Sequence, residues 1–269
     1  MIYQPLLLSL WIWFQVHKLT LGILPTNNLV PPGFRPNDQY VHVVVARFHE
    51  PIDHLNWLIK YPHTIYNRGE PAATSLRVVD CLENVGREAF IFFQHIVRHY
   101  DHLAEVNVFT QAVQNVKTLY TEEDLRDDVK RFAMAARNKT KDSQILSELN
   151  DGFVFLVPFC ESSLNVLHMK NLKKEYGEEK CKIFSEGYEK LLNFTVANPR
   201  FSGTSCFAVT REAILRNSKD YYIRLARTLG SEINPIEGHF FERAWPQVFH
   251  SQCSSHQNFH CLLDSKLNC

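Results

Sequence analysis

The sequence lacks an excess of charge of either sign, since 29 lysine and arginine residues balance 29 aspartate and glutamate residues among 269. This balance excludes a protein that acts through a basic surface on nucleic acid, so we expect no nucleic acid partner. Glycine and proline are scarce, at 10 and 12 residues, which excludes collagen-like and low-complexity chains. Aromatic residues make up 12% of the chain, which argues against disorder and indicates a globular domain with a buried core.

Several catalytic motifs are also absent. The chain contains no G-x-x-x-x-G-K-[ST] and no G-x-G-x-x-G segment, which disfavours P-loop NTPases and dinucleotide-binding enzymes. The segment around Ser205 lacks the second glycine of a nucleophile elbow, so we do not expect an α/β-hydrolase. His49 and His54 are five residues apart with Pro51 between them, whereas a zincin helix needs two histidines four residues apart.

The N-terminal segment contains no apolar run of the roughly 20 residues that a membrane-spanning helix needs. The shorter apolar run 5–16 fits a signal peptide over residues 1–22, with Thr20 and Gly22 at a small-x-small cleavage site. A short uncleaved anchor and a chance composition are the alternatives. Residues 23–39 are rich in proline and asparagine, which indicates a linker.

Two sequons, at Asn138 and Asn193, favour glycosylation and passage through the secretory pathway. We therefore expect a secreted protein or one in the Golgi or endoplasmic reticulum lumen, with membrane contact only through an N-terminal anchor.

The seven cysteines include no C-x-x-C pair, which argues against zinc knuckles and redox motifs. Three of them, Cys253, Cys261 and Cys269, lie in the tail 251–269. In an oxidising compartment we expect the tail to form a disulfide, with Cys206 or Cys160 as possible partners. The alternative is that some cysteines are simply buried thiols.

The hydrophobic pattern between residues 40 and 250 alternates between strands and helices. It predicts strands at 40–47, 63–67, 106–111 and 205–210, and helices at 53–60, 86–100, 121–137, 160–195, 211–229 and 237–249. This alternation predicts a single α/β domain with a mainly parallel central sheet flanked by helices.

One histidine pair deserves a test as a metal site. His95 and His99 are four residues apart on a predicted helix, with Glu88 near the same face, a geometry that can hold a divalent ion. Two imidazoles one turn apart are also common on a solvated helix face.

Three segments are unusual when taken together. The first is YVHVVVARFHE with Asp53 and Trp57 after it, the second is NVGREAF at 84–90, and the third is FSGTSCFAVTREAIL at 201–215, followed by EGHFFERAWPQVF. In their order, these segments resemble the DUF3431 family over roughly residues 40–250. The family name implies no activity.

The layout is also similar, more distantly, to GT-A glycosyltransferases. That resemblance implies a GT-A-like fold, a nucleotide-sugar donor and a carbohydrate acceptor. It implies donor binding near Asn84, Gly86, Arg87 and Glu88, where N-x-G opens a helix. It also implies an acceptor side at Phe201, Ser202 and Gly203, and a catalytic base at Glu237 or Glu242.

The chain departs from that family after the third predicted strand. The expected D-x-D acids are replaced by residues 110–115, TQAVQN, which contain Gln111, Gln114 and Asn115. A metal that bridges a diphosphate prefers carboxylate oxygens, which these residues lack. We therefore expect either a metal-independent enzyme in which Arg87, Arg47 or Arg68 neutralises the diphosphate, or a site that has lost glycosyl transfer.

Other interpretations remain open. A non-catalytic lumenal carbohydrate-binding or interaction module could use the same scaffold, and a metal-dependent hydrolase could use the histidine pair with Glu88. Locally, residues 84–88 could be a capped turn, Gly203 a loop glycine, and Glu242 with Arg243 an exposed charge pair.

Overall fold

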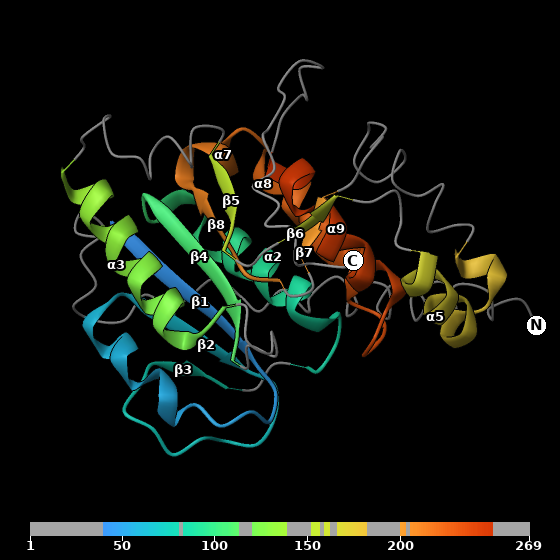
Figure 1. Cartoon of the computed structure of the whole chain (residues 1–269), viewed down its shortest axis with the longest axis horizontal. Coiled ribbons are helices and arrows are strands. Elements are labelled where there is room, and N and C mark those ends of the chain that lie inside the picture. The colour runs from blue at the N-terminus through green and yellow to red at the C-terminus, as the bar shows by residue number, and fades with distance from the viewer. Residues whose placement is uncertain are drawn as a thin grey trace, which may run out of the picture. The chain divides into compact units, whose positions relative to one another are not determined.

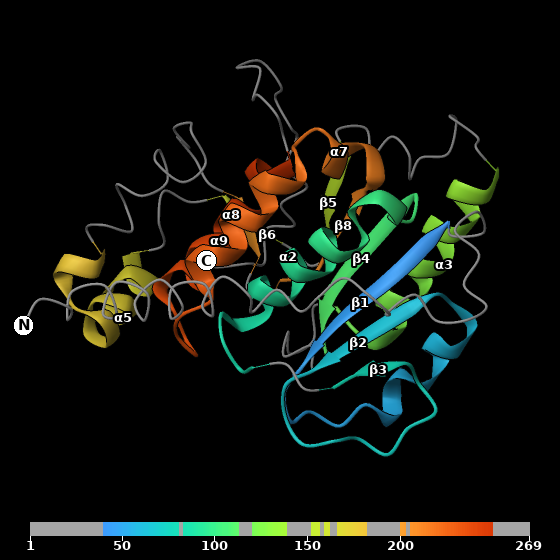
Figure 2. The same ribbon diagram turned by 180° about the vertical axis from the view of Figure 1, so that it is seen from behind.

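The structure is a computed structural model that describes residues 40–80, 83–112, 120–138, 152–156, 159–161, 166–181, 200–202 and 205–249 (Figure 1). These residues form a single α/β domain, as the sequence predicts. Its centre is a six-stranded, mostly parallel sheet with helices on both faces (Figures 1 and 2).

The sheet has the strand order β3-β2-β1-β4-β8-β5. β1 is central and pairs in parallel with β2 and β4, while β8 runs antiparallel to β4 and β5. Every residue of β1 is buried, which suits a strand covered on both faces. The strands are β1 Val41–Arg47, β2 His63–Asn67, β3 Val78–Val79, β4 Val106–Gln111, β5 Phe153–Phe155 and β8 Phe207–Thr210.

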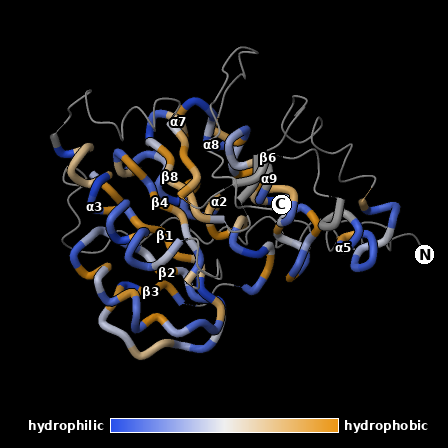
Figure 3. The backbone as a smooth tube through the Cα atoms, viewed as in Figure 1, coloured by the Kyte–Doolittle hydropathy of each residue, from blue (hydrophilic) through white to orange (hydrophobic). Residues whose placement is uncertain are grey.

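Alternate residues of β1 belong to two separate hydrophobic cores, because successive side chains of a strand point to opposite faces. One core lies under α2 (Arg87–His99), α8 (Lys219–Leu229) and α9 (Ile236–Phe249). It is dominated by aromatic side chains, among them Phe92, Phe93, Phe207, Phe241 and Trp245. The other lies under α3 (Glu122–Asn138) and the 3-10 helix η2 (Asp53–Lys60). Figure 3 shows the apolar residues along the strands and the hydrophilic character of much of α5 (Val166–Tyr176).

The remaining elements are short. They are the 3-10 helix η3 Tyr100–His102, the helix α7 Arg211–Leu215, and the strands β6 Phe159–Glu161 and β7 Arg200–Ser202, which form a two-stranded sheet. Within the described residues, none of the helices has both the length and the apolar character required to cross a membrane.

Most predicted elements agree with the structure, and three need correction. Residues 53–60 form a 3-10 helix. The predicted helix 211–229 is two helices, because the Ser218 side chain accepts a hydrogen bond from the Tyr221 N–H and so caps the start of the second one. The predicted helix 160–195 begins too early, since its described part contains the end of strand β6 before α5. Three other short strands, β3, β5 and β7, were not predicted. The predicted cap of 121–137 is present, since Thr121 and Asp124 exchange hydrogen bonds.

Some predictions fall outside the described residues. These are the signal peptide or anchor 1–22, the linker 23–39, Asn193, Gly203 and the tail 251–269. Asn138 closes α3, but its side chain is not described. The possible disulfide of Cys206 is wrong, since this residue, just before β8, is a buried free thiol, and burial raises its pKa to about 12.

Candidate functional site

The carboxyl edge of the parallel strands is the natural position for a site in this fold. The strand order reverses between β1 and β4, and α/β sheets bind ligands outside such a switch point. Helix α2 begins at this edge, because it connects the carboxyl end of β3 to the amino end of β4. The antiparallel β8 brings its amino end, with Ser205, to the same edge.

The first residues of α2 have an unusual backbone. Gly86 and Arg87 both adopt left-handed φ angles, of 70° and 54°, and Arg87 is the only non-glycine residue with positive φ in the described part of the chain. A left-handed conformation costs an L-residue about 1–2 kcal/mol. Strain of this kind persists where surrounding contacts enforce it, and it concentrates at functional sites.

The Arg87 side chain supplies those contacts by reaching α9. Its Nη2 lies 2.7 Å from Glu242 Oε1, and its Nη1 lies 2.7 Å from His239 Nε2. Gly238 makes room for the arginine, since a Cβ there would lie 2.8 Å from Arg87 Cδ. Burial alone would lower the pKa of Arg87, but the charges of Glu88 and Glu242 outweigh it and raise that pKa. The guanidinium is therefore a firmly held cation.

Glu88 continues the network into the core. Only 7% of this residue is exposed, and Oε1 accepts a hydrogen bond of 2.8 Å from the Ser205 hydroxyl. That hydroxyl in turn accepts from Trp245 Nε1 at 3.4 Å, while Glu88 Oε2 lies 3.6 Å from Arg87 Nε. We use the term Arg87 cluster for Arg87, Glu88, Ser205, His239 and Glu242. It joins three segments that are far apart in the sequence.

Replacing Ser205 by alanine tests the buried end of the cluster. The substitution removes the hydroxyl that donates to Glu88 and accepts from Trp245, so we expect the free energy of unfolding to fall by about 1–3 kcal/mol. Urea denaturation measures this, with the exposed Ser231→Ala as the control. A S205A protein as stable as the control would show that the hydroxyl does not stabilise Glu88.

The two other arginines expected to bind a donor lie at the same edge but bond to the chain itself. Arg47 is buried and donates to Asn67 Oδ1 and to the carbonyls of Glu50 and Glu70, both at 2.8 Å. It thereby ties together the loops that follow β1 and β2. Arg68 donates to the Val85 carbonyl at 2.5 Å, just before α2 begins. Burial lowers the pKa of Arg68, an effect that the charge of Glu88 opposes.

The remaining expected site residues are less closely involved. Gln111 is the last residue of β4, at the carboxyl edge. Asn84 precedes the cluster, and Glu237 lies in the first turn of α9, but neither side chain makes a hydrogen bond or ion pair with a described residue. Ser202 ends β7 and its side chain is not described.

Two members of the cluster, Ser205 and His239, were not predicted as site residues. His239 precedes Glu242 by three residues, so their shared helix face was a usable signal. Ser205 gave no comparable signal, since its role depends on the antiparallel pairing of β8 with β4.

The histidine pair lies elsewhere. His95 is 1% exposed, not on a solvated face, and its Nδ1 lies 3.0 Å from the Tyr66 hydroxyl. Its ring is 4.5 Å from that of His99 and 5.0 Å from that of His42 on β1. Glu88 is two helical turns away, about 10 Å along the axis, so it does not join the pair. Within the described ranges, no group of three or more His, Cys, Asp or Glu side chains is arranged to hold a metal ion.

Comparison with known proteins gives one match. A family model for proteins of unknown function, DUF3431, covers residues 43–264. Searches of curated proteins and of solved structures each found no significant match. Because the family model covers most of the chain, including all of the Arg87 cluster, this protein belongs to the DUF3431 family.

Proposed function

We propose that this protein is a glycosyltransferase-like enzyme of the secretory pathway, which transfers a sugar from a nucleotide-sugar donor to a hydroxyl of a carbohydrate acceptor. The observation that carries the proposal is the Arg87–Glu242 pair at 2.7 Å. It joins the segment that opens α2 to a carboxylate of α9, beside the switch point where α/β sheets bind ligands.

The chemistry assigns a role to each side of the pair. In an inverting transfer, the oxygen of the acceptor hydroxyl attacks the anomeric carbon of the donor sugar. Glu242 accepts the proton that this hydroxyl loses. The sugar–phosphate bond breaks, and Arg87 with backbone N–H groups stabilises the departing diphosphate. Arg87 suits this role because its planar guanidinium binds phosphate oxygens in a bidentate manner.

The same pair links donor binding to the base. In the structure the guanidinium of Arg87 is shared by Glu242 and His239. A bound diphosphate competes with Glu242 for that cation, so donor binding would release the carboxylate toward the acceptor. In the structure, His239 Nδ1 lies 3.7 Å from Glu242 Oε2, so the imidazole would be the polar group next to the released carboxylate.

Donor binding is the direct test. We expect at least one uridine, guanosine or cytidine diphosphate sugar, offered with and without Mn²⁺, to raise the melting temperature. A ligand at a hundred times its Kd adds about 2.7 kcal/mol. Arg87→Met should abolish this stabilisation, whereas Arg227→Met, on an exposed position of α8, should retain it. No stabilisation by any donor under either condition would contradict the proposal.

The base is tested separately by Glu242→Gln. This variant keeps the shape of the side chain, so it should still bind the donor while transfer falls by about 10²–10⁴-fold. Product formation on a panel of carbohydrate acceptors is the measurement. Unchanged transfer by E242Q would exclude Glu242 as the base.

A non-catalytic carbohydrate-binding module is the second candidate, and one observation favours it. The charge of Arg87 is already compensated by Glu242 and Glu88. Such compensation is expected if the role of Arg87 is only to connect α2 with α9. In that case free glycans would stabilise the protein, nucleotide sugars would not, and no transfer would be detected.

A further inference from the structure

A hollow of about 530 Å³ lies at the amino edge of the sheet. Its walls come from Tyr40, which precedes β1, from the connection between η2 and β2 at residues 60–62, and from the outer face of α3. β1 separates it from the edge that carries the Arg87 cluster. Because β1 has seven residues, the two sites are about 20 Å apart.

Three basic side chains surround this hollow. They are Lys60, Lys130 and Arg137, and among the described residues that line it none is a carboxylate. None of the three forms an ion pair or hydrogen bond within the described ranges, although the chain as a whole has zero net charge. Elsewhere on α3, Arg126 and Arg131 are paired with Glu123 and Asp128. Among the described residues, no acidic side chain therefore offsets the three positive charges around the hollow.

The spacing on α3 makes this arrangement a continuous face. Lys130, Met134 and Arg137 follow one another at intervals of four and three residues, so they lie on one side of the helix. Met134 is 57% exposed, which is unusual for a large apolar residue. It offers an adaptable apolar surface between two cations.

The opposite wall is aromatic and fixed. The Tyr61 ring packs edge-on against Trp57, with ring centroids 6.0 Å apart, and both rings rest on the hydrophobic core under α3. Tyr40 adds a second aromatic ring. A flat ligand could therefore lie against these rings while its charged groups meet the three basic side chains.

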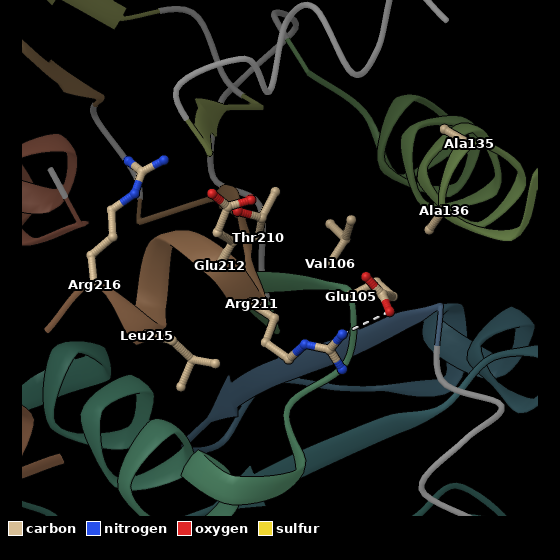
Figure 4. A pocket seen from close by; sticks show the side chains of 9 residues that line it. All are labelled: Glu105, Val106, Ala135, Ala136, Thr210, Arg211, Glu212, Leu215 and Arg216. Carbon is tan, nitrogen blue, oxygen red and sulfur yellow. Dashed lines mark hydrogen bonds and ion pairs between the residues drawn. The ribbon is translucent and has the colours of Figure 1, made fainter. Parts of the chain in front are cut away.

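Another hollow, also lined by described residues, has a different character (Figure 4). It measures about 640 Å³ and lies between α3 and α7. Its arginines are offset by acids, since Arg211 pairs with Glu105 at 2.8 Å and Glu212 also lines the wall. The two hollows therefore differ in that only the one at the amino edge has basic side chains with no acidic side chain in its described lining.

We propose that the hollow at the amino edge binds a ligand whose phosphate or sulfate groups are carried on a ring, such as a phosphorylated or sulfated sugar. Arg137 binds the anion in a bidentate manner, and Lys60 and Lys130 act as point charges. The ring of the ligand lies against Tyr61 and Met134. This site is separate from the Arg87 cluster and does not depend on the proposed transfer reaction.

Calorimetric titration with two probes tests the proposal. Inorganic tripolyphosphate supplies phosphate alone, and sucrose octasulfate supplies sulfate groups on rings. We expect at least one probe to bind, with an affinity that falls as salt is added, because exposed charges are screened. Tighter binding of the second probe supports the contacts of the ring with Tyr61 and Met134, whereas binding of the first probe alone would contradict them. Failure of both probes to bind at low salt would overturn the proposal.

Matched variants locate the binding. The double variant Lys130→Gln with Arg137→Gln should weaken binding by about tenfold, a change that corresponds to two lost charge contacts. The control, Lys174→Gln with Arg227→Gln, removes the same charges from exposed positions of α5 and α8 and should bind as the wild type does. Equal weakening in both double variants would show a net-charge effect only. Loss of binding in Arg87→Met would place the anion in the Arg87 cluster, and either result would overturn the proposal.

Discussion

Replacing Gly86 by alanine is expected to lower the free energy of unfolding by about 2–5 kcal/mol. The residue has φ of 70°, which costs an L-residue about 1–2 kcal/mol. A Cβ at this position would also lie 2.5 Å from Phe90 Cβ and 2.7 Å from the Leu229 carbonyl oxygen. These atoms belong to the backbone or lie next to it, so they cannot swing aside, and overpacking adds about 1–3 kcal/mol.

Gly177→Ala is the matched control. Gly177 has a similar φ of 84°, but nothing lies within 4 Å of the position that its Cβ would occupy. The control should therefore show the conformational cost alone, about 1–2 kcal/mol. Denaturation in urea measures both variants, and their difference is the cost of the close approach between α2 and α8. Equal losses in G86A and G177A would contradict the packing argument.

Acidification is expected to destabilise the domain steeply below pH 6.5. Burial lowers the pKa values of His42 and His95 well below 6.5, and burial together with Arg77 and Arg98 lowers that of His99 to about 4. Below pH 6.5 these histidines therefore bind protons in the unfolded chain but stay neutral in the folded chain. Stability is fully present above pH 6.5 and is lost as the pH falls, by up to about 1.4 kcal/mol per pH unit for each histidine.

The surroundings of these histidines explain why the folded protein does not stabilise their protonated forms. The charged groups that act on them are Arg77, Arg98 and other histidines, all of which oppose a further positive charge. The Tyr66 hydroxyl, 3.0 Å from His95 Nδ1, is a neutral group and does not offset such a charge.

Unfolding measured between pH 7 and pH 4.5 tests this prediction. His99→Gln should flatten the decline, since it removes one of the titrating groups. The exposed His49→Gln should leave the decline unchanged, because His49 is not among the charges that act on these histidines. A stability that does not change between pH 7 and pH 5 would show that the cluster can accept protons when folded.

The sequence predicted the central strands better than the edges of the sheet. β1, β2 and β4 are recognisable because buried β-branched runs have few alternatives to a central strand. β3, β5, β6 and β7 have two or three residues each, too few for a periodicity. Such short strands form because a neighbouring strand provides hydrogen-bond partners. That pairing depends on the tertiary structure and not on the local sequence.

The residues of the candidate site were predicted unevenly for a similar reason. The resemblance to GT-A enzymes implied that Arg87, Glu88 and Glu242 act together, and the structure brings these three side chains into contact. The bonds of Arg47 to nearby carbonyls follow from loop geometry that the sequence does not reveal. Likewise, the spacing of His95 and His99 says that they share a helix face but not that β1 covers it.

The order of the elements along the chain has a consequence for biosynthesis. The strands β1 to β4 and helix α2 leave the ribosome well before β8, α8 and α9, which provide their partners. Until α9 has emerged, Phe92 and Phe93 lack their contacts with Trp245 and Phe241, and Arg87 lacks the Glu242 carboxylate. The apolar face of α2 therefore stays exposed while more than a hundred further residues are synthesised. We expect such exposed apolar surface to make the unfinished domain prone to aggregation until α9 has been added.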